Sequence, residues 1–177
     1  MTPTSSRGLA PWMIVALGGL VAGTIDITYA CTFWGIKAGV LPPRIFQSVA
    51  AGLLGRDAAV AGGWSTAALG LVLHYCIATT VAFVFYAAAR YAPGLWRRPW
   101  LWGALYGVAV YGAMTYIVVP LSRAGGGGGK PNVLWITLSI LIHAFGIGVP
   151  VALAARAALG GTTPVSPTLV TGAPAEV

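Results

Sequence analysis

Residues Leu69–Arg90 read LGLVLHYCIATTVAFVFYAAAR, a run of mostly apolar side chains that ends at an arginine. Since about 20 helical residues cross the hydrocarbon core of a bilayer, this stretch predicts a membrane-spanning helix. His74 lies near its middle. A titratable ring is costly to place at that depth, and it therefore indicates a functional position within a transmembrane helix.

The composition of the whole chain supports the same class of protein. Of its 177 residues, 58% are hydrophobic and 7% are charged, whereas soluble domains carry about 25% charged residues. The net charge of +7 comes from basic residues scattered between apolar segments, so we expect them to anchor helices at anionic lipid surfaces. The lipid bilayer is the expected partner. No nucleic acid is expected, because the sequence has no basic face or base-stacking motif.

Four apolar segments predict four membrane spans, at about residues 11–33, 64–89, 100–121 and 133–158. The ends of the chain, residues 1–10 and 159–177, are polar or rich in Gly, Pro and Thr, and we expect them to be disordered. The predicted fold class is an all-α membrane protein, a bundle of four transmembrane helices with both termini on one side of the bilayer.

The segment between the first two spans is too polar and too broken to cross a membrane. After the pair Pro42-Pro43, the apolar residues Ile45, Val49 and Leu53 recur at every fourth position, with Phe46 and Ala50 beside them. This spacing predicts one face of a short amphipathic helix, at about residues 43–56. Such a helix is expected to lie flat in the membrane interface.

The two halves of the chain share a layout that suggests two repeated helical hairpins. Gly19 and Gly23 form a G-x-x-x-G step in the first span, and Gly103 and Gly107 form another in the third. Steps of this kind let neighbouring helices approach closely. The second and fourth spans each carry a central histidine and a terminal arginine. Either a parallel duplication of one hairpin or chance similarity between Ala-, Gly- and Val-rich segments produces this pattern.

Three polar residues of the predicted membrane region form the candidate site: His74, His143 and Asp26. The second and fourth spans run in the same direction, and each histidine lies about ten residues along its span, so the two rings should lie within about one helical turn of the same depth. Asp26, on the antiparallel first span, is expected about one to two turns away. It is the one acidic residue expected inside the membrane.

Three interpretations of these residues are open. In the first, each histidine bonds a nearby carbonyl or hydroxyl group and holds two helices together, which contributes about 0.6 kcal/mol per bond. In the second, the three residues line a pathway for protons or for a solute, since histidine titrates near neutrality. In the third, His74 and His143 are the axial ligands of a b-type haem. Against the third, no basic residue lies close to either histidine in the sequence to meet the haem propionates.

The sequence argues against several other kinds of site. Glycines 125–129 precede a lysine, but Ala124 and Pro131 stand where a phosphate-binding loop requires glycine and a hydroxyl residue, so we expect a flexible connector and no nucleotide. Cys31 and Cys76 lack metal-ligand spacing and should lie at different depths, so neither a metal site nor a disulfide is expected. No Ser–His–acid arrangement and no paired carboxylates are present, and an enzyme is not expected.

Several landmarks occur in a fixed order along the chain: Gly19-Leu-Val-Ala-Gly23, Leu41-Pro42-Pro43-Arg44, His74, Pro120-Leu121 and His143. On these landmarks, over about residues 12–157, the chain resembles the uncharacterised four-span bacterial inner-membrane proteins of the YagU-like type. The resemblance implies a location in the bacterial inner membrane and a four-span topology. It implies no biochemical activity and no functional residue.

The expected function is that of a small permeability or transport protein with His74, His143 and Asp26 as its polar path. The alternative is a structural or accessory subunit that binds a partner through its small-residue helix faces. Because so short a chain forms a thin wall around any path, a homo-oligomer or a complex with another membrane protein is expected. The three arginines within residues 90–98 favour cytoplasmic termini.

Overall fold

The computed structural model describes residues 9–125 and 132–160. Within those two ranges the chain is helical and contains no strand, and four of its helical segments are long and apolar enough to cross a membrane. The all-α fold class and the four candidate spans are thereby confirmed. Of the ends expected to be disordered, residues 1–8 and 161–177 lie outside the described residues, as do residues 126–131 of the expected flexible connector. The sequence also predicts disorder at residues 159 and 160, but they form the last residues of the helix Val149–Gly160.

Two of the spans are single helices, α1 (Pro11–Ala38) and α4 (Gly63–Tyr91), and the other two are each divided by a wider π-helical stretch. The divided spans consist of α6 (Pro99–Ala113), η1 (Met114–Val118) and α7 (Val119–Leu121), and of α8 (Val133–Leu141), η2 (Ile142–Gly148) and α9 (Val149–Gly160). The short helix α5 (Pro93–Arg97) joins α4 to α6. Three spans have 28 or 29 residues, so at 1.5 Å per residue they exceed a hydrocarbon core of about 30 Å and must tilt or extend beyond it.

The first span is longer than its apolar pattern predicts. The pattern indicates an end near residue 33, but α1 continues to Ala38 and includes Lys37 in its last turn. The helix stops at Gly39, whose φ of 63° is a left-handed conformation that glycine adopts without strain, and the Gly39 N–H donates to the Gly35 carbonyl. The end of the helix is therefore set by this glycine and not by the end of the apolar run.

Both π-helical stretches precede a proline. Pro120 follows η1 and Pro150 follows η2. A proline inside a helix removes one backbone donor, and its ring clashes with the carbonyl four residues earlier, at Tyr116 and Gly146 respectively. Widening the preceding turn relieves this clash, so the helix continues through the proline. The third span accordingly runs past Pro120 and ends at Leu121.

The segment between α1 and α4 forms two short helices, α2 (Pro42–Leu54) and α3 (Arg56–Ala61). They are joined at Gly55, where a φ of 87° turns the chain. α2 corresponds to the interface helix predicted at residues 43–56, and the break at Gly55 that separates off α3 is a departure from that prediction. The glycine ends α2 because few other residues adopt this backbone conformation.

α2 packs on α4 along one edge of the face that its apolar pattern indicates. Its buried residues include Gln47 and Ala50, whereas Leu53 of the predicted apolar face is 54% exposed. The helices touch closely, because a Cβ at Gly70 of α4 would overlap the carbonyl oxygen of Phe46. Small residues lie where the helices meet, as is usual between membrane helices. α2 is therefore part of the bundle as well as an amphipathic helix.

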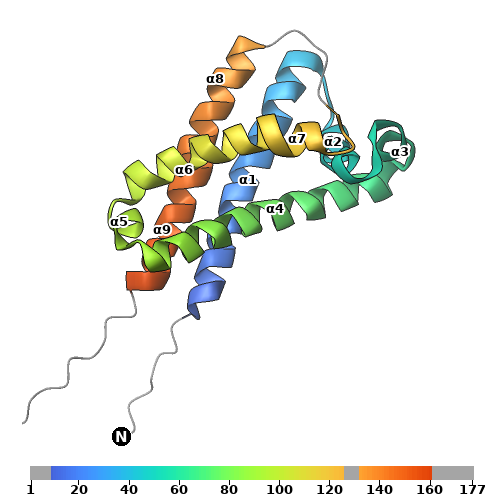
Figure 1. Ribbon diagram of the computed structural model, residues 1–177. Helices are drawn as coiled ribbons and strands as arrows, with labels where there is room; N and C mark the ends of the chain where they lie inside the picture. The colour runs from blue at the N-terminus through green and yellow to red at the C-terminus, as the bar shows by residue number, and fades with distance from the viewer. Residues whose placement is uncertain (1–8, 126–131, 161–177) are drawn as a thin grey trace, which may run out of the picture.

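The spans pack in a definite order. α1 packs against α4 and against η2 and α9, and the third span packs on η2 and α9 as well. Figure 1 shows α4 and α6 crossing α1 and the fourth span at wide angles. The first turn of α1 and the last turn of α9 lie at one end of the bundle, and α2 and α3 lie at the other (Figure 1).

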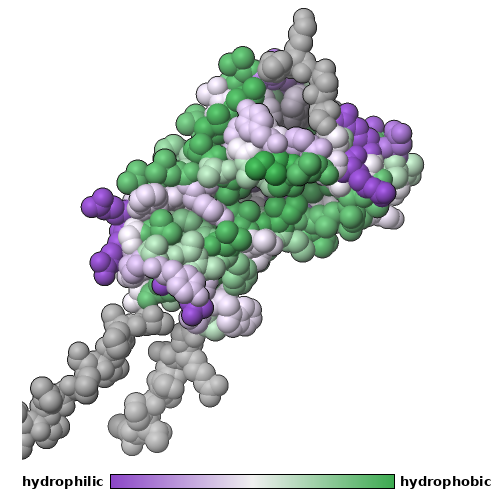
Figure 2. Space-filling view, viewed as in Figure 1, coloured by the Kyte–Doolittle hydropathy of each residue, from purple (hydrophilic) through white to green (hydrophobic). Residues whose placement is uncertain are grey.

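The surface fits the membrane class. In Figure 2, hydrophilic residues gather beside α5 and around α3, and a mostly hydrophobic surface lies between them. Large apolar side chains of the spans are exposed, including Val72, Leu105 and Ile117. Lipid tails are as apolar as these side chains and cover them at no cost in a bilayer, so this exposure is expected of membrane-spanning helices.

Tyr106 of α6 makes a polar contact with α4. Its hydroxyl donates to the carbonyl oxygen of Val81 at 2.8 Å, and its ring centre lies 5.0 Å from that of Phe85. We expect Tyr106→Phe to lower the free energy of unfolding by about 0.5–1.5 kcal/mol, because the hydrogen bond is lost while the ring contact stays. Unfolding in mixed micelles, followed by circular dichroism, measures this change. The control is Tyr116→Phe, at a tyrosine that is 74% exposed, and an equal loss there would contradict the assignment.

Candidate functional site: a polar cavity inside the bundle

A cavity of about 310 Å³ lies within the bundle, and its wall includes all three candidate polar residues. Asp26 comes from α1, His74 from α4 and His143 from η2. The rest of the wall is largely apolar and is drawn from all four spans and from α2. A mostly apolar cavity with a few convergent polar groups is the usual form of a small-molecule site, for which volumes of about 300–1,000 Å³ are typical.

His74 uses one ring nitrogen to join α4 to α1. Its Nε2 lies 2.8 Å from the carbonyl oxygen of Gly23, and because a carbonyl only accepts, Nε2 carries the proton and donates it. The ring also meets the edge of the Tyr75 ring, with centres 5.5 Å apart. The other nitrogen, Nδ1, makes no hydrogen bond to any residue that the structure describes. It therefore stays free as an acceptor.

His143 has the complementary arrangement on the fourth span. Its Nδ1 donates to the carbonyl oxygen of Ser139 at 2.8 Å, within its own helix. The ring of Tyr111 lies edge-on to it, with centres 5.2 Å apart. Nε2 has no hydrogen-bond partner within residues 9–125 and 132–160. Both histidines of the cavity wall thus hold one proton on a backbone carbonyl and leave one nitrogen unbonded.

Asp26 differs from the histidines because no hydrogen bond or ion pair within the described residues engages its carboxylate. The side chain is half-buried on α1, and it makes no hydrogen bond or ion pair with the described part of the chain. A carboxylate in a transmembrane helix normally pairs with another group or faces a cavity. Asp26 faces a cavity.

The bonds of the histidines agree with the first interpretation, in which they hold helices together. His74 bonds α1 through Gly23, although His143 bonds only its own helix. That interpretation gives Asp26 no role, since the carboxylate has no partner among the described residues. Helix packing therefore accounts for one nitrogen of each histidine and leaves the acid unexplained.

The cavity wall fits a haem poorly. His74 already uses Nε2, the outer ring nitrogen, for the Gly23 carbonyl. No arginine or lysine lines the cavity to meet propionates. No group of three or more His, Cys, Asp or Glu side chains in the described ranges could hold a metal ion, and Cys31 and Cys76 are both free thiols. The function proposed for this cavity needs no bound metal or cofactor.

The four glycines of the G-x-x-x-G steps all lie at contacts between spans of this chain. A Cβ at Gly19 would lie 2.7 Å from the Thr79 Cα, and one at Gly23 would lie 2.9 Å from the Ala78 Cβ, both on α4. A Cβ at Gly103 would lie 2.7 Å from the Gly148 carbonyl oxygen, and one at Gly107 would overlap the carbonyl oxygen of His143. Their small faces are therefore occupied within the chain.

These contacts repeat between the two predicted hairpins. Gly23, the second glycine of the first step, lies beside His74 of the following span, whose ring bonds its carbonyl. Gly107, the second glycine of the second step, lies against the backbone of His143 of its following span. In both hairpins the second glycine lies beside the histidine of the following span, although the contacting atoms differ. This arrangement agrees with a duplicated hairpin in which α2 and α3 are inserted in the first copy and the two π-helical stretches, η1 and η2, occur in the second.

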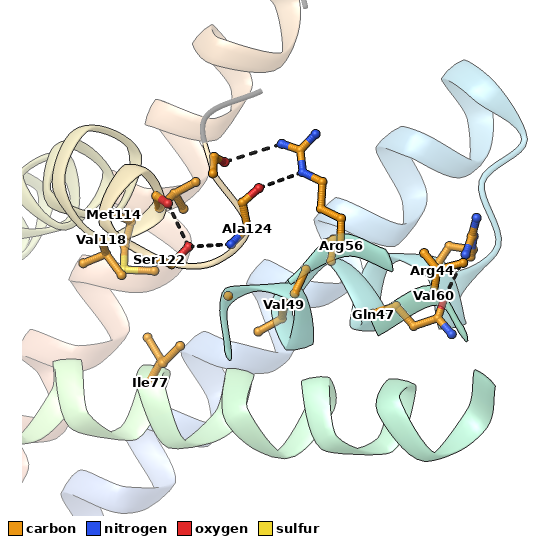
Figure 3. Close-up of a pocket in the computed structure, with 15 residues that line it drawn as sticks. Arg44, Gln47, Val49, Arg56, Val60, Ile77, Met114, Val118, Ser122 and Ala124 are labelled. Carbon is orange, nitrogen blue, oxygen red and sulfur yellow. Dashed lines mark hydrogen bonds between the residues drawn. The ribbon is translucent and has the colours of Figure 1, made fainter. Parts of the chain in front are cut away.

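A second, larger cavity of about 560 Å³ lies between α2 and α3 on one side and η1 and α7 on the other. Figure 3 shows part of its wall, including Arg44 on α2 and Arg56 on α3. Sequence reasoning missed this cavity. The two arginines that flank the short helix are visible in the sequence, but nothing there indicates that the end of the third span comes to lie against them.

The two cavities adjoin. Four residues line both of them: Val49, Ile77, Met114 and Val119. These shared side chains lie between the polar residues of the smaller cavity and the larger one. The three predicted residues thus lie next to a hollow that leads toward the α2–α3 end of the bundle.

The chain is a four-span helical bundle with a polar cavity at its centre. Comparisons of the sequence and the structure with protein-family models, curated proteins and solved structures found no match. The resemblance to YagU-like proteins therefore stays a sequence-based prediction. The residues that line the cavity are the remaining indication of function.

Proposed function

We propose that the protein carries protons or a small polar solute across a membrane through the cavity that Asp26, His74 and His143 line. The observation that carries this proposal is their convergence, since three polar residues from three different spans share one wall. Ionisable residues within transmembrane helices mark proton and solute routes. Histidine side chains suit such a route because the ring offers both a proton donor and an acceptor.

The free groups of the cavity support this function. Asp26 accepts no hydrogen bond from the described residues, and each histidine keeps one free nitrogen. These groups can receive a hydrogen bond from a solute or a proton from water. The adjoining cavity supplies a route from the α2–α3 end to these groups once Val49, Ile77, Met114 and Val119 move apart.

The accessory-subunit alternative receives less support. It relies on small-residue helix faces that are open to a partner, and the faces of Gly19, Gly23, Gly103 and Gly107 are used inside the chain. We propose transport and not catalysis, since the cavity wall holds no nucleophile beside a base. A second copy of the chain is the proposed partner in the membrane, because four spans form a thin wall around the cavity.

Flux into vesicles tests the proposed function. Purified protein in liposomes that contain a pH-sensitive dye should dissipate a proton gradient faster than empty liposomes do, or should admit a small polar solute. We expect Ile77→Trp to slow this flux, because Ile77 lines both cavities and the larger ring fills them. The control is Val72→Trp, on the same helix at a 60% exposed position outside both cavities. Wild-type flux equal to that of empty liposomes, for protons and solutes alike, would refute transport.

We further propose that the membrane is the bacterial inner membrane and that the termini are cytoplasmic. The end of the bundle that holds the first turn of α1 and the last turn of α9 also holds α5 (Figure 1). The segment from the end of α4 through α5 carries Arg90, Arg97 and Arg98 within nine residues, and such density favours the cytoplasmic side. In a cysteine-free background, Arg98→Cys should react with an impermeant maleimide only after spheroplasts are opened. Asp57→Cys on α3 should react in intact spheroplasts, and the reverse pattern would invert the topology.

A further inference from the structure

We propose that the larger cavity, between α2–α3 and the end of the third span, binds one anionic phospholipid. The head group would lie beside Arg44 and Arg56, and one acyl chain would lie in the apolar part of the cavity. Neither arginine belongs to the polar wall of the smaller cavity. The proposal therefore stands apart from transport and can fail or succeed without it.

The polar part of this cavity carries positive charge without a matching acid. Arg44 and Arg56 line it, and no aspartate or glutamate does. Arg44 donates one hydrogen bond, to the Gln47 Oε1 at 3.2 Å, and Arg56 donates two, to the Ala124 and Gly125 carbonyls at 2.7 and 3.4 Å. A guanidinium group has five N–H donors. Among the described residues, four donors of Arg44 and three of Arg56 therefore remain without a partner. Figure 3 shows the two guanidinium groups pointing in different directions, so each would bond a different part of the head group.

The opposite part of the cavity is apolar. Figure 3 shows Ile77, Met114 and Val118 grouped on one side, Arg44 on the other, and Arg56 between them. A free phosphate ion would use the arginines alone and would leave this apolar wall against water. A lipid covers both parts, since its charged head and its chain are joined. The volume of about 560 Å³ leaves room for part of one acyl chain.

The position of the cavity also suits a lipid. It lies at the α2–α3 end of the bundle, where Figure 2 shows hydrophilic residues meeting the apolar surface of the spans. Lipid head groups occupy that level in a bilayer, and a basic pocket between transmembrane helices suits an anionic head group. In the proposed topology this lipid would come from the leaflet that faces away from the cytoplasm. The charge and the depth of the site therefore agree.

The walls of the cavity are held together without a ligand. The backbone N–H of Arg123, just after α7, donates to the carbonyl oxygen of Gly52 in α2 at 3.0 Å. Arg56 of α3 adds its bond to the Ala124 carbonyl. The cavity is therefore largely preformed, and binding loses little free energy to ordering its walls.

Native mass spectrometry of the full-length protein in detergent tests the proposal with three probes: phosphatidylglycerol, phosphatidylcholine and glycerol phosphate. We expect one phosphatidylglycerol to bind saturably to each chain, and phosphatidylcholine of the same chain length to bind about tenfold more weakly, because charge-assisted bonds to arginine are lost. Glycerol phosphate should not bind. Equal binding of the two lipids would overturn the proposal, and so would glycerol phosphate binding as tightly as the lipid.

Matched variants locate the site. The double variant Arg44→Gln and Arg56→Gln should weaken phosphatidylglycerol binding by about tenfold or more, and Arg90→Gln with Arg98→Gln, at the other end of the bundle, should not. Arg44→Gln alone should weaken binding by less than the double variant. Because it keeps the Arg56 bond to the Ala124 carbonyl, this loss of affinity cannot come from loosening the segment that follows α7. An unchanged affinity in both the single and the double variant would exclude the arginines as the head-group site.

The apolar part has its own pair of variants. Val118→Trp should fill the space of the acyl chain and weaken lipid binding, since Val118 lines the cavity and is 45% exposed. Val108→Trp, on the same span and 42% exposed, lies outside both cavities and is the control. If both tryptophans weaken binding equally, the lipid lies on the general surface of the spans and not in this cavity.

Discussion

Gly107→Ala is expected to lower the free energy of unfolding by about 3 kcal/mol, at the upper end of the usual cost of overpacking. The added Cβ would overlap the carbonyl oxygen of His143 and lie 2.8 Å from the Cα of Ala144. Both are backbone atoms, so no side chain can rotate away, and the third span must move off the fourth. Unfolding in mixed micelles, followed by tryptophan fluorescence, measures the loss.

The same helix supplies the control for this prediction. Nothing lies within 4 Å of a Cβ built at Gly112, so Gly112→Ala should leave stability unchanged or raise it by up to about 1 kcal/mol through helix propensity. A Gly107→Ala protein as stable as Gly112→Ala would show that the third and fourth spans do not pack as closely as the structure has them. The contrast isolates one contact, because both variants add the same methyl group.

The sequence predicts the four spans well because length and apolarity alone decide whether a helix crosses a bilayer. The same signal says little about which face of each helix meets the protein. Lipid tails and neighbouring helices are both apolar, so burial leaves no hydrophobic period in the sequence. In these spans the glycines carry that information, as Gly19 and Gly107 show by lying at the closest helix contacts.

The short helix between the first two spans shows where apolar periodicity misleads. The pattern of Ile45, Val49 and Leu53, with Phe46 and Ala50 beside them, marks an apolar face. Ala50 is buried as that pattern predicts, but Gln47 is buried as well and Leu53 is exposed. Gln47 is buried because its Nε2 donates to the Gly63 carbonyl at 2.8 Å, a partner that lies in the first turn of α4. A buried polar residue satisfied by a distant carbonyl cannot be recognised from local sequence.

That the three polar residues lie near one another was predictable from the sequence, whereas the larger cavity beside them was not; their role as a functional site stays a prediction. The equal depth of His74 and His143 follows from counting residues along two spans of the same direction, and the structure places both on one cavity wall with Asp26. The second cavity depends on α2 lying against α4 and on α7 passing close to it. Both are tertiary contacts without a local signal, so Arg44 and Arg56 looked like ordinary interface charges.

Asp26→Asn is expected to reduce the flux of protons or solute by about ten- to a hundredfold while the fold stays intact. A hydrogen bond to a charged group contributes about 1.5–3 kcal/mol, and each 1.4 kcal/mol corresponds to about tenfold. Asparagine has the shape of aspartate but neither its charge nor its proton. Because the carboxylate bonds none of the described residues, its replacement removes no contact that stabilises the protein.

Asp57→Asn on α3 is the matched control for Asp26→Asn, since it makes the same chemical change at an exposed acid outside both cavities. Flux through liposomes and unfolding in micelles are measured on both variants. Loss of flux at Asp26 with unchanged stability separates a transport group from a packing group, because a packing group would lower both. Equal flux in the two variants would remove Asp26 from the pathway, and the histidines alone, each with one nitrogen already bonded to a carbonyl, would then support only the packing of the bundle.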